Sequence, residues 1–208
     1  LKQVPACEYF PTQAVETNIL GVENIIRAID ELRLDIETVV GVSTDKACKP
    51  VNVMGMTKAI QERMFIQANI RCPQTRFVGV RYGNVLVSRG SIIPLFHEQI
   101  KSGEPLTITS PDMTRFLLSL DQAVDIVFSA IRFAKPGEIY IPRVPSARII
   151  DLAQALIGDR KNEIKVIGVR PGEKMHEILI SEEELFRSIK RNEYYVVLPI
   201  LPSLQCQE

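Results

Sequence analysis

The chain has 208 residues, of which 46% are hydrophobic and 24% charged, with 25 Lys plus Arg against 25 Asp plus Glu. This balance is typical of a globular protein, and it argues against a nucleic-acid partner held by a broad basic face. No apolar run approaches the ~20 residues that span a bilayer, so we expect a cytoplasmic protein with no membrane segment in this chain. The dispersed cysteines and two separate histidines predict neither a metal site nor a disulfide framework.

The first third of the chain alternates helix and strand patterns. Apolar residues recur at helical spacing over 12–33, and a short β-branched run at 38–42 is typical of a strand buried on both faces. A second helix is predicted over 53–70 and a second buried strand over 76–82. This alternation predicts an α/β fold with a doubly wound parallel sheet.

After residue 85 the elements become shorter. In chain order we expect helix 92–102, strand 106–109, helix 120–133, strand 138–141, helix 148–157, strand 164–167, a helix beginning near Lys174 and a strand at 194–197. These elements predict a smaller α/β lobe. We place the boundary between residues 1–85 and 86–208, and we expect the chain to cross it more than once.

The densest polar stretch follows the strand predicted at 38–42. It reads Ser-Thr-Asp-Lys-Ala from Ser43, and the next helix then carries Met54 and Lys58 on one face, because they are four residues apart. In open α/β sheets, ligands bind at the carboxyl ends of the strands. Asp45 and Lys46, an acid beside a base at that edge, are therefore placed for proton transfer.

Five motifs in this order resemble one known family. They are STDKAxxPxNxMGxxK (43–58), RYGNV (81–85), SRGS (88–91), TRF (114–116) and RPGEK (170–174). Together they resemble the polysaccharide-biosynthesis dehydratases acting on UDP-N-acetylglucosamine, the capsule- and flagellin-sugar branch of the extended short-chain dehydrogenase/reductase family. The resemblance covers nearly all of residues 1–198. It implies that 1–85 is part of a Rossmann-like NAD domain, and that 86–208 is mainly a lobe that binds a nucleotide sugar.

The resemblance also implies a reaction. Enzyme-bound NAD takes a hydride from sugar C4, the 4-ketone acidifies the C5 proton, water leaves from C6, and the hydride returns to C6. The product is a 4-keto-6-deoxy sugar for surface polysaccharide, with or without inversion at C5. NAD and NADP are not distinguishable from this sequence. The implied partners are a UDP-sugar and further copies of the chain, since helices 12–33 and 53–70 match those that pair subunits in the wider family.

Roles carried over from the family fall first on the Ser-Thr-Asp-Lys stretch. Asp45 would protonate the departing C6 hydroxyl, Lys46 would remove the C5 proton, and Thr44 would assist at the C4 oxygen. An ordinary Asp titrates near ~3.9 and an ordinary Lys near ~10.4, so both roles require pKa values shifted toward neutrality. Burial produces such shifts, whereas mutual attraction opposes them. We therefore expect bound sugar to desolvate the pair.

Met54 departs from the wider family, where a tyrosine precedes the lysine by four residues. A thioether is too weak an acceptor to take the proton of the C4 hydroxyl, so Asp45, Lys46 or a water would have to do so. Lys58 keeps its expected role at the nicotinamide ribose. The alternative for Met54 is plain helix packing.

Further residues are assigned to the two ligands by the same resemblance. The expected cofactor-binding residues are Ser43, Lys58, Arg81 and Tyr82. The expected substrate-binding residues are Asn84, Arg89, Arg115, Arg170 and Glu173, with the arginines on the pyrophosphate and Glu173 on the uridine ribose.

The sequence lacks the Gly-rich strand-to-helix turn that holds the NAD pyrophosphate. The chain also begins at Leu1, directly before a helical pattern, and it reads as a piece of a longer protein. We therefore expect the strand at 38–42 to have an exposed edge. We also expect these 208 residues alone neither to bind NAD tightly nor to turn over substrate.

Two other functions stay open. A UDP-sugar 4-epimerase would share the fold, although it needs no base at C5 and no acid at C6, so the Asp45–Lys46 pair argues against it. The third hypothesis is a non-catalytic fragment that only binds a nucleotide sugar.

Overall fold

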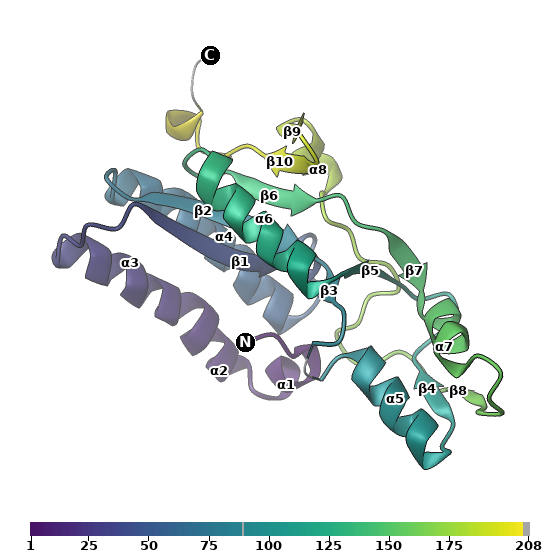
Figure 1. Cartoon of the computed structure of the whole chain (residues 1–208). Coiled ribbons are helices and arrows are strands. Elements are labelled where there is room, and N and C mark those ends of the chain that lie inside the picture. Colours follow the sequence, from purple (N-terminus) through teal and green to yellow (C-terminus); the bar gives the residue numbers. More distant parts are fainter. Residues whose placement is uncertain (89, 206–208) are drawn as a thin grey trace.

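The computed structural model describes residues 1–88 and 90–205, and it confirms a mixed α/β fold with parallel strands (Figure 1). Its main sheet has five strands in the order β1-β2-β6-β10-β9. β1 pairs with β2 and β2 with β6 in parallel, whereas β10 runs antiparallel to both β6 and β9. The bounds are β1 (Thr38–Thr44), β2 (Arg76–Tyr82), β6 (Ile139–Pro142), β9 (Ser188–Arg191) and β10 (Tyr194–Val197).

Helices cover both faces of this sheet (Figure 1). One face carries α4 (Val53–Arg71) with α3 (Gly21–Glu31) outside it, and the other carries α6 (Leu120–Phe133). Alternate residues of β2 pack on opposite faces of the sheet, because successive side chains of a strand point in opposite directions. Phe77 packs in the α3–α4 cluster, while Val78 and Val80 pack in the α6 cluster. The apolar run predicted for this strand is thus explained by burial on both sides.

β1 is the outermost strand of the sheet, as expected, and its side chains differ in burial, since Ser43 is buried whereas Val42 is exposed. Val42 is 41% exposed and pairs with Val80 of β2 on its one hydrogen-bonded side. The prediction that this strand is buried on both faces is therefore wrong for Val42, since only β2 flanks it.

The helix predicted over 12–33 is confirmed as a continuous helical run that follows α1 (Val4–Tyr9). It comprises α2 (Pro11–Val15), the π-helical turn η1 (Glu16–Leu20) and α3. Asn18 lies in the π turn, is buried, and donates from Nδ2 to the Thr57 hydroxyl at 3.0 Å. The extra residue of a π turn thus accommodates a polar side chain that interrupts the apolar pattern.

The second part of the molecule lies beyond the carboxyl ends of β1 and β2 (Figure 1). Its core joins α5 (Ile92–Ser102), β4 (Leu106–Ile108), α7 (Ile149–Ile157) and β8 (Ile164–Val166). A three-stranded sheet orders β3-β5-β7, with bounds β3 (Asn84–Val85), β5 (Thr114–Leu118) and β7 (Ser146–Arg148). The short β3, β5, β7 and β9 were not predicted, because they are fixed by their partners rather than by an apolar run.

The division at residue 85 does not follow the main sheet. The chain leaves this sheet after β2, returns with α6 and β6, leaves again, and comes back with β9 and β10. Residues 120–142 and 188–197 therefore belong with the first part of the chain.

The helix predicted near Lys174 is wrong. Residues 171–180 form turns and bends, and the short α8 (Glu182–Leu185) follows. Met175 packs in the α5–α7 cluster whereas Leu179 and Ile180 pack beside β6 and β10, so these apolar residues do not share one helix face. Within residues 1–88 and 90–205, no helix combines the length and apolar character needed to cross a membrane.

Candidate active site

The loop after β1 is held by local side-chain contacts. Thr44 caps a short 3₁₀ turn, η2 (Asp45–Ala47), by accepting from the Lys46 N–H at 3.4 Å, and its hydroxyl donates to Asp45 Oδ1 at 2.8 Å. Asn52 then caps α4 by accepting from the Gly55 N–H at 2.7 Å. Gly55 lies directly against this loop, because a Cβ there would overlap the carbonyl oxygen of Lys46.

Asp45 and Lys46 form a close pair at this edge of the sheet. Lys46 Nζ lies 2.9 Å from Asp45 Oδ1, and the Asp45 side chain is fully buried whereas that of Lys46 is 16% exposed. Asp45 Oδ2 is buried and has no hydrogen-bond partner. An unsatisfied buried carboxylate oxygen is costly, so a hydrogen-bond partner for Asp45 Oδ2 would lower this cost.

Two residues that the sequence did not single out complete the surroundings of the pair. Glu177 Oε1 lies 3.6 Å from Lys46 Nζ, and its other oxygen lies 3.4 Å from Lys174 Nζ. Lys174 also donates to the Cys48 carbonyl at 2.7 Å. The segment that contains Arg-Pro-Gly-Glu-Lys thus packs directly over the loop after β1, although more than a hundred residues separate them in the chain.

Lys58 reaches the same strand from α4. Its Nζ donates to the Val42 carbonyl at 3.0 Å. Burial lowers the pKa of Lys58, and the charge of Glu62 one turn along the helix acts in the opposite direction. Asn84, just past β2, has a buried side-chain oxygen without a partner. The ends of β1 and β2 are adjacent in register, since Thr44 pairs with Tyr82.

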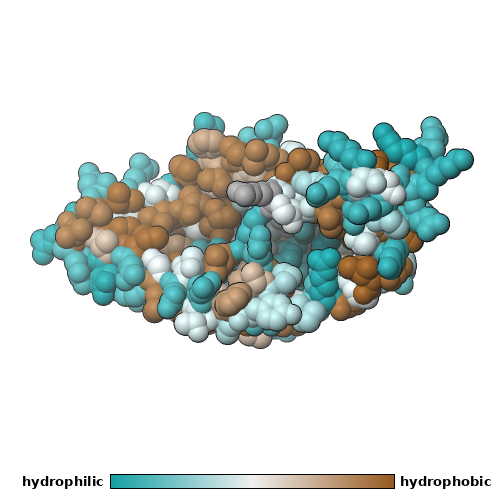
Figure 2. Space-filling view, turned by 90° about the horizontal axis from the view of Figure 1, so that it is seen from below, coloured by the Kyte–Doolittle hydropathy of each residue, from teal (hydrophilic) through white to brown (hydrophobic). Residues whose placement is uncertain are grey.

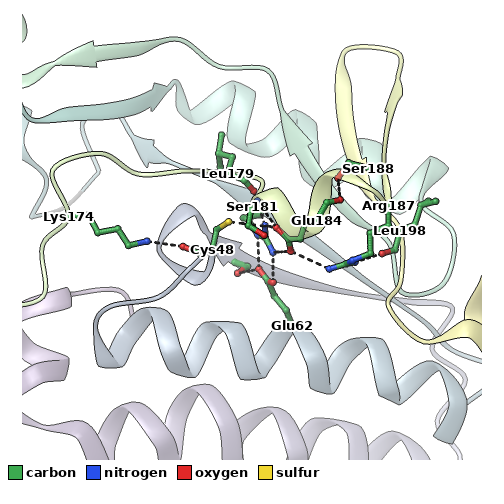
Figure 3. Close-up of polar contacts among 11 residues, drawn as sticks. Cys48, Glu62, Lys174, Leu179, Ser181, Glu184, Arg187, Ser188 and Leu198 are labelled. Atoms are coloured by element: carbon green, nitrogen blue, oxygen red, sulfur yellow. Dashed lines mark hydrogen bonds and ion pairs between the residues drawn. The ribbon is translucent and has the colours of Figure 1, made fainter.

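The Arg81 side chain does not lie in the setting expected of a cofactor-binding residue. It is 2% exposed, and its guanidinium donates to Glu62 at 3.0 and 2.7 Å, to Glu184 at 2.8 and 2.9 Å, and to the Leu179 carbonyl at 2.8 Å. Figure 3 shows Glu62 reaching up from α4 and Glu184 extending from α8, and both carboxylates pair with Arg81. Since these five contacts use all five donors of a guanidinium, the prediction for Arg81 is corrected to an internal ion-pair cluster.

Ser43 belongs to the same cluster. Its hydroxyl donates to Glu62 Oε1 at 2.5 Å, so it is turned into the sheet–α4 interface and not toward a ligand. Burial alone raises the pKa of Glu184, but the hydrogen bond and charge of Arg81 outweigh it and hold the value at about 2. Burial raises the pKa of the neighbouring Cys48 thiol to about 12. The cluster is thus a fixed arrangement of charges with a neutral thiol beside it.

Met54 is a packing residue. It is 3% exposed and lies in a buried cluster with Val4, Cys7 and Ala14, against the N-terminal helices. The expectation of a catalytic position for Met54 is therefore corrected to its alternative, helix packing. Tyr82 packs beside the α6 cluster, and burial raises the pKa of its hydroxyl.

The expected substrate-binding arginines fall in different settings. Arg115 is buried and donates to the carbonyls of Thr114 and Met175, at 2.7 and 3.3 Å. Arg170 is exposed, and its backbone N–H donates to Glu173 at 3.4 Å. The predicted Arg89 lies outside the described residues. Glu62, Glu177 and Glu184 were missed because single acidic residues in helical or turn patterns carry no motif signal.

The chain is similar to known proteins in both family and fold. A family model described as "Polysaccharide biosynthesis protein" matches residues 1–199. An uncharacterized membrane protein of Methanocaldococcus jannaschii is 49% identical over 211 residues, covering 96% of this chain and 62% of that protein. A UDP-glucose 4-epimerase of Rickettsia massiliae is 47% identical over 199 residues, covering 94% of this chain and 58% of that protein.

Two solved structures share the fold. Pen from Bacillus thuringiensis has a TM-score of 0.90 at 36% identity, covering 97% of this chain and 65% of that one. DesIV from Streptomyces venezuelae, a dTDP-glucose 4,6-dehydratase solved with NAD and TYD bound, has a TM-score of 0.77 at 18% identity, covering 88% of this chain and 63% of that one. The chain thus spans less than two thirds of each of these proteins. With a family match over nearly its whole length, the chain belongs to the polysaccharide biosynthesis protein family.

Proposed function

We propose that this chain supplies the proton-transfer loop and much of the nucleotide-sugar site of an NAD-dependent 4,6-dehydratase acting on a UDP-N-acetyl-hexosamine. The observation that carries the proposal is the Asp45–Lys46 pair, 2.9 Å apart at the carboxyl end of β1. The buried Asp45 Oδ2 has no hydrogen-bond partner. It could accept a hydrogen bond from a sugar hydroxyl, or donate one when Asp45 is protonated.

The residues present fit part of an NAD site. Lys58 lies against β1 at Val42, where a ribose hydroxyl could replace or join the carbonyl as a partner of its amine. NAD would supply the hydride acceptor for the oxidation at C4 and return the hydride at C6. Asn84 Oδ1, buried and unsatisfied, is a second polar group at this edge. The Gly-rich turn for the pyrophosphate is not in this sequence.

The elimination requires one proton to leave C5 and one to reach the C6 oxygen. If Lys46 accepts the first and Asp45 donates the second, the pair ends as an ammonium beside a carboxylate. Lys46 would return its proton to C5 when the hydride reaches C6, and the C4 hydroxyl, on oxidation, would release the proton that Asp45 passes to the C6 oxygen. Bound sugar favours the neutral amine that takes the C5 proton, because desolvation disfavours the ammonium form. Over one cycle both side chains then end in their starting protonation states.

A UDP-sugar 4-epimerase is the second candidate, and the names of the Rickettsia relatives favour it. An epimerase inverts C4 through the same ketone and needs no acid at C6. The buried acid beside Lys46 would then have no chemical task. A nucleotide-sugar-binding fragment without activity is the third candidate.

The test uses the whole protein that contains this chain, incubated with NAD and UDP-N-acetylglucosamine in D₂O. A dehydratase gives a product lighter by one water, with deuterium at C5. A product of unchanged mass with inverted C4 and no deuterium at C5 would overturn the proposal in favour of the epimerase. Binding without any product would favour the non-catalytic fragment. UDP-glucose serves as the comparison substrate.

Homo-oligomer formation is also proposed, on the exposed apolar residues of the helical face. Figure 2 shows hydrophobic residues gathered on the half of the molecule where α3 lies. The large exposed side chains on α3 and α4 include Ile25, Met56, Ile60 and Ile70, between 46% and 51% exposed. Patches of this kind mark interaction sites. Size-exclusion chromatography with light scattering would measure the mass, and a monomer at high concentration would contradict this proposal.

A further inference from the structure

Four charged side chains alternate in sign around the loop after β1. In order they are Asp45, Lys46, Glu177 and Lys174, joined by N–O distances of 2.9, 3.6 and 3.4 Å. Their side chains are 0%, 16%, 1% and 13% exposed. The row has no net charge, but both of its carboxylates keep one buried oxygen without a hydrogen bond, Asp45 Oδ2 and Glu177 Oε2.

Glu177 is buried, and within residues 1–88 and 90–205 the ammonium groups that pair with it are those of Lys46 and Lys174. Burying an isolated carboxylate costs free energy. The ammonium groups of Lys46 and Lys174 offset this cost for Glu177, because both face it. Lys174 is fixed by its hydrogen bond to the Cys48 carbonyl. Glu177, which is also paired with Lys174, thus lies 3.6 Å from Lys46 Nζ. The Lys46 amine can approach either carboxylate.

We propose that Glu177 is a positioning residue for Lys46, holding its amine between two carboxylates and controlling how readily it becomes the neutral base at C5. This inference rests on the proposed dehydration. Lys46 loses the field of one anion when Glu177 is neutralised, so its ammonium form is then less favoured. Lys174 acts in the opposite sense, because it offsets the charge of Glu177.

Two carboxylates face Lys46 in the described residues. Asp45 lies on the same turn, and Glu177 lies on the covering segment with Lys174 behind it. Lys58 on α4 is directed to the Val42 carbonyl instead. Substitution of Glu177 changes only one of the two carboxylates in contact with Lys46, so its effect can be separated from that of Asp45.

The first experiment compares pH–rate profiles of dehydration for the whole protein and its Glu177→Gln variant. We expect the rising limb, where the C5 base loses its proton, to move to lower pH by about one unit, the typical effect of one charge at this distance. A variant with a lower rate but an unmoved limb would show that Glu177 is merely structural and overturn the inference. Glu183→Gln is the matched control, because its carboxylate is 73% exposed and faces Lys49 instead.

The second experiment does not depend on activity. Trace acylation of lysines at fixed pH, read by peptide mass spectrometry against Lys49, reports how much of each amine is neutral and free. We expect Lys46 to react roughly three- to tenfold faster in Glu177→Gln and more slowly in Lys174→Gln, where Glu177 is left to Lys46 alone. Unchanged Lys46 reactivity in both variants would overturn the inference. If the wild type gives no dehydrated product while these shifts occur, the proposed function fails but the coupling of Glu177 to Lys46 stands.

Discussion

Two clusters of charged side chains lie near the carboxyl ends of β1 and β2. They differ in how many of their polar atoms have a hydrogen-bond partner. The Arg81 cluster contains Glu62 and Glu184, and every guanidinium donor has a partner. The Asp45–Lys46 cluster contains Glu177, and two of its carboxylate oxygens have no hydrogen bond, although one of them, Glu177 Oε2, lies 3.4 Å from Lys174 Nζ. Both are buried, so burial alone does not separate a structural cluster from a site.

The difference separates a saturated cluster from one that keeps hydrogen-bonding capacity. A fully hydrogen-bonded buried network is rigid and has no capacity for another partner. A buried oxygen that lacks a partner needs an explanation, and a bound hydroxyl is one. We therefore expect substitutions in the Arg81 cluster to reduce stability and substitutions around Lys46 to reduce turnover.

The largest effect is expected for Asp45→Asn in the whole protein. The amide can still accept from Thr44 but cannot donate an acidic proton to the C6 oxygen, so dehydration should fall by about 10²–10⁴-fold, with binding of the nucleotide sugar retained. Product formation followed by mass spectrometry measures this. Asp151→Asn, which removes an exposed carboxylate paired with Arg148, is the control. Near-normal turnover in Asp45→Asn would contradict the comparison.

The next effect is expected for Arg81→Met. It leaves Glu62 and Glu184 buried without their shared partner, which should lower the free energy of unfolding by about 3–5 kcal/mol. Urea denaturation measures this loss. Arg148→Met is the control. It removes a bidentate arginine–carboxylate pair at the surface, where little change in the free energy of unfolding is expected. Adding Glu62→Gln and Glu184→Gln should restore part of the lost stability, and no recovery would argue against unpaired charge as the cause.

Acid should weaken the Arg81 cluster next. The pKa of Glu184 is about 2 in the folded chain against an ordinary 4.5, because Arg81 outweighs the effect of burial. A carboxyl whose pKa is lower in the folded state stabilises the fold above its unfolded value, and the contribution is lost as the pH falls toward the folded value. The free energy of unfolding should thus fall by roughly 2 kcal/mol between pH 4.5 and 2. Glu184→Gln should flatten this part of the curve, and an equally steep curve would assign the acid sensitivity to other carboxyls.

The smallest effect is expected for Met54→Leu. Because Met54 packs with Val4, Cys7 and Ala14, a residue of similar volume should change the free energy of unfolding by less than about 1.5 kcal/mol. Turnover should stay near the wild-type rate. A large loss of turnover with unchanged stability would return Met54 to the chemistry at C4.

The strongest sequence patterns predicted the main elements. β2 has a continuous apolar run and α6 has a clear apolar period, and the structure places these two elements and α4 within one or two residues of the predicted bounds. The loop from Ser43 to Lys46 was found by its motif and its place after a strand. These signals are local, and local signals are what a sequence shows directly.

The remaining features depend on contacts between distant residues. Arg81 contacts Glu184 across 103 positions, so its motif suggested a ligand where the fold provides two carboxylates. A helix was predicted to begin near Lys174, but residues 171–180 form turns and bends. Tertiary ion pairs with the loop after β1 hold this segment in an irregular form instead.

The contact of Gly55 with the Lys46 carbonyl limits how the loop can respond to a bound molecule. The missing side chain at position 55 allows helix α4 and the 3₁₀ turn to touch backbone to backbone, with no space left between them. The main chain of Lys46 therefore cannot move toward the helix. If a sugar binds here as proposed, rotation about the bonds of the Lys46 side chain is the adjustment that this contact leaves open.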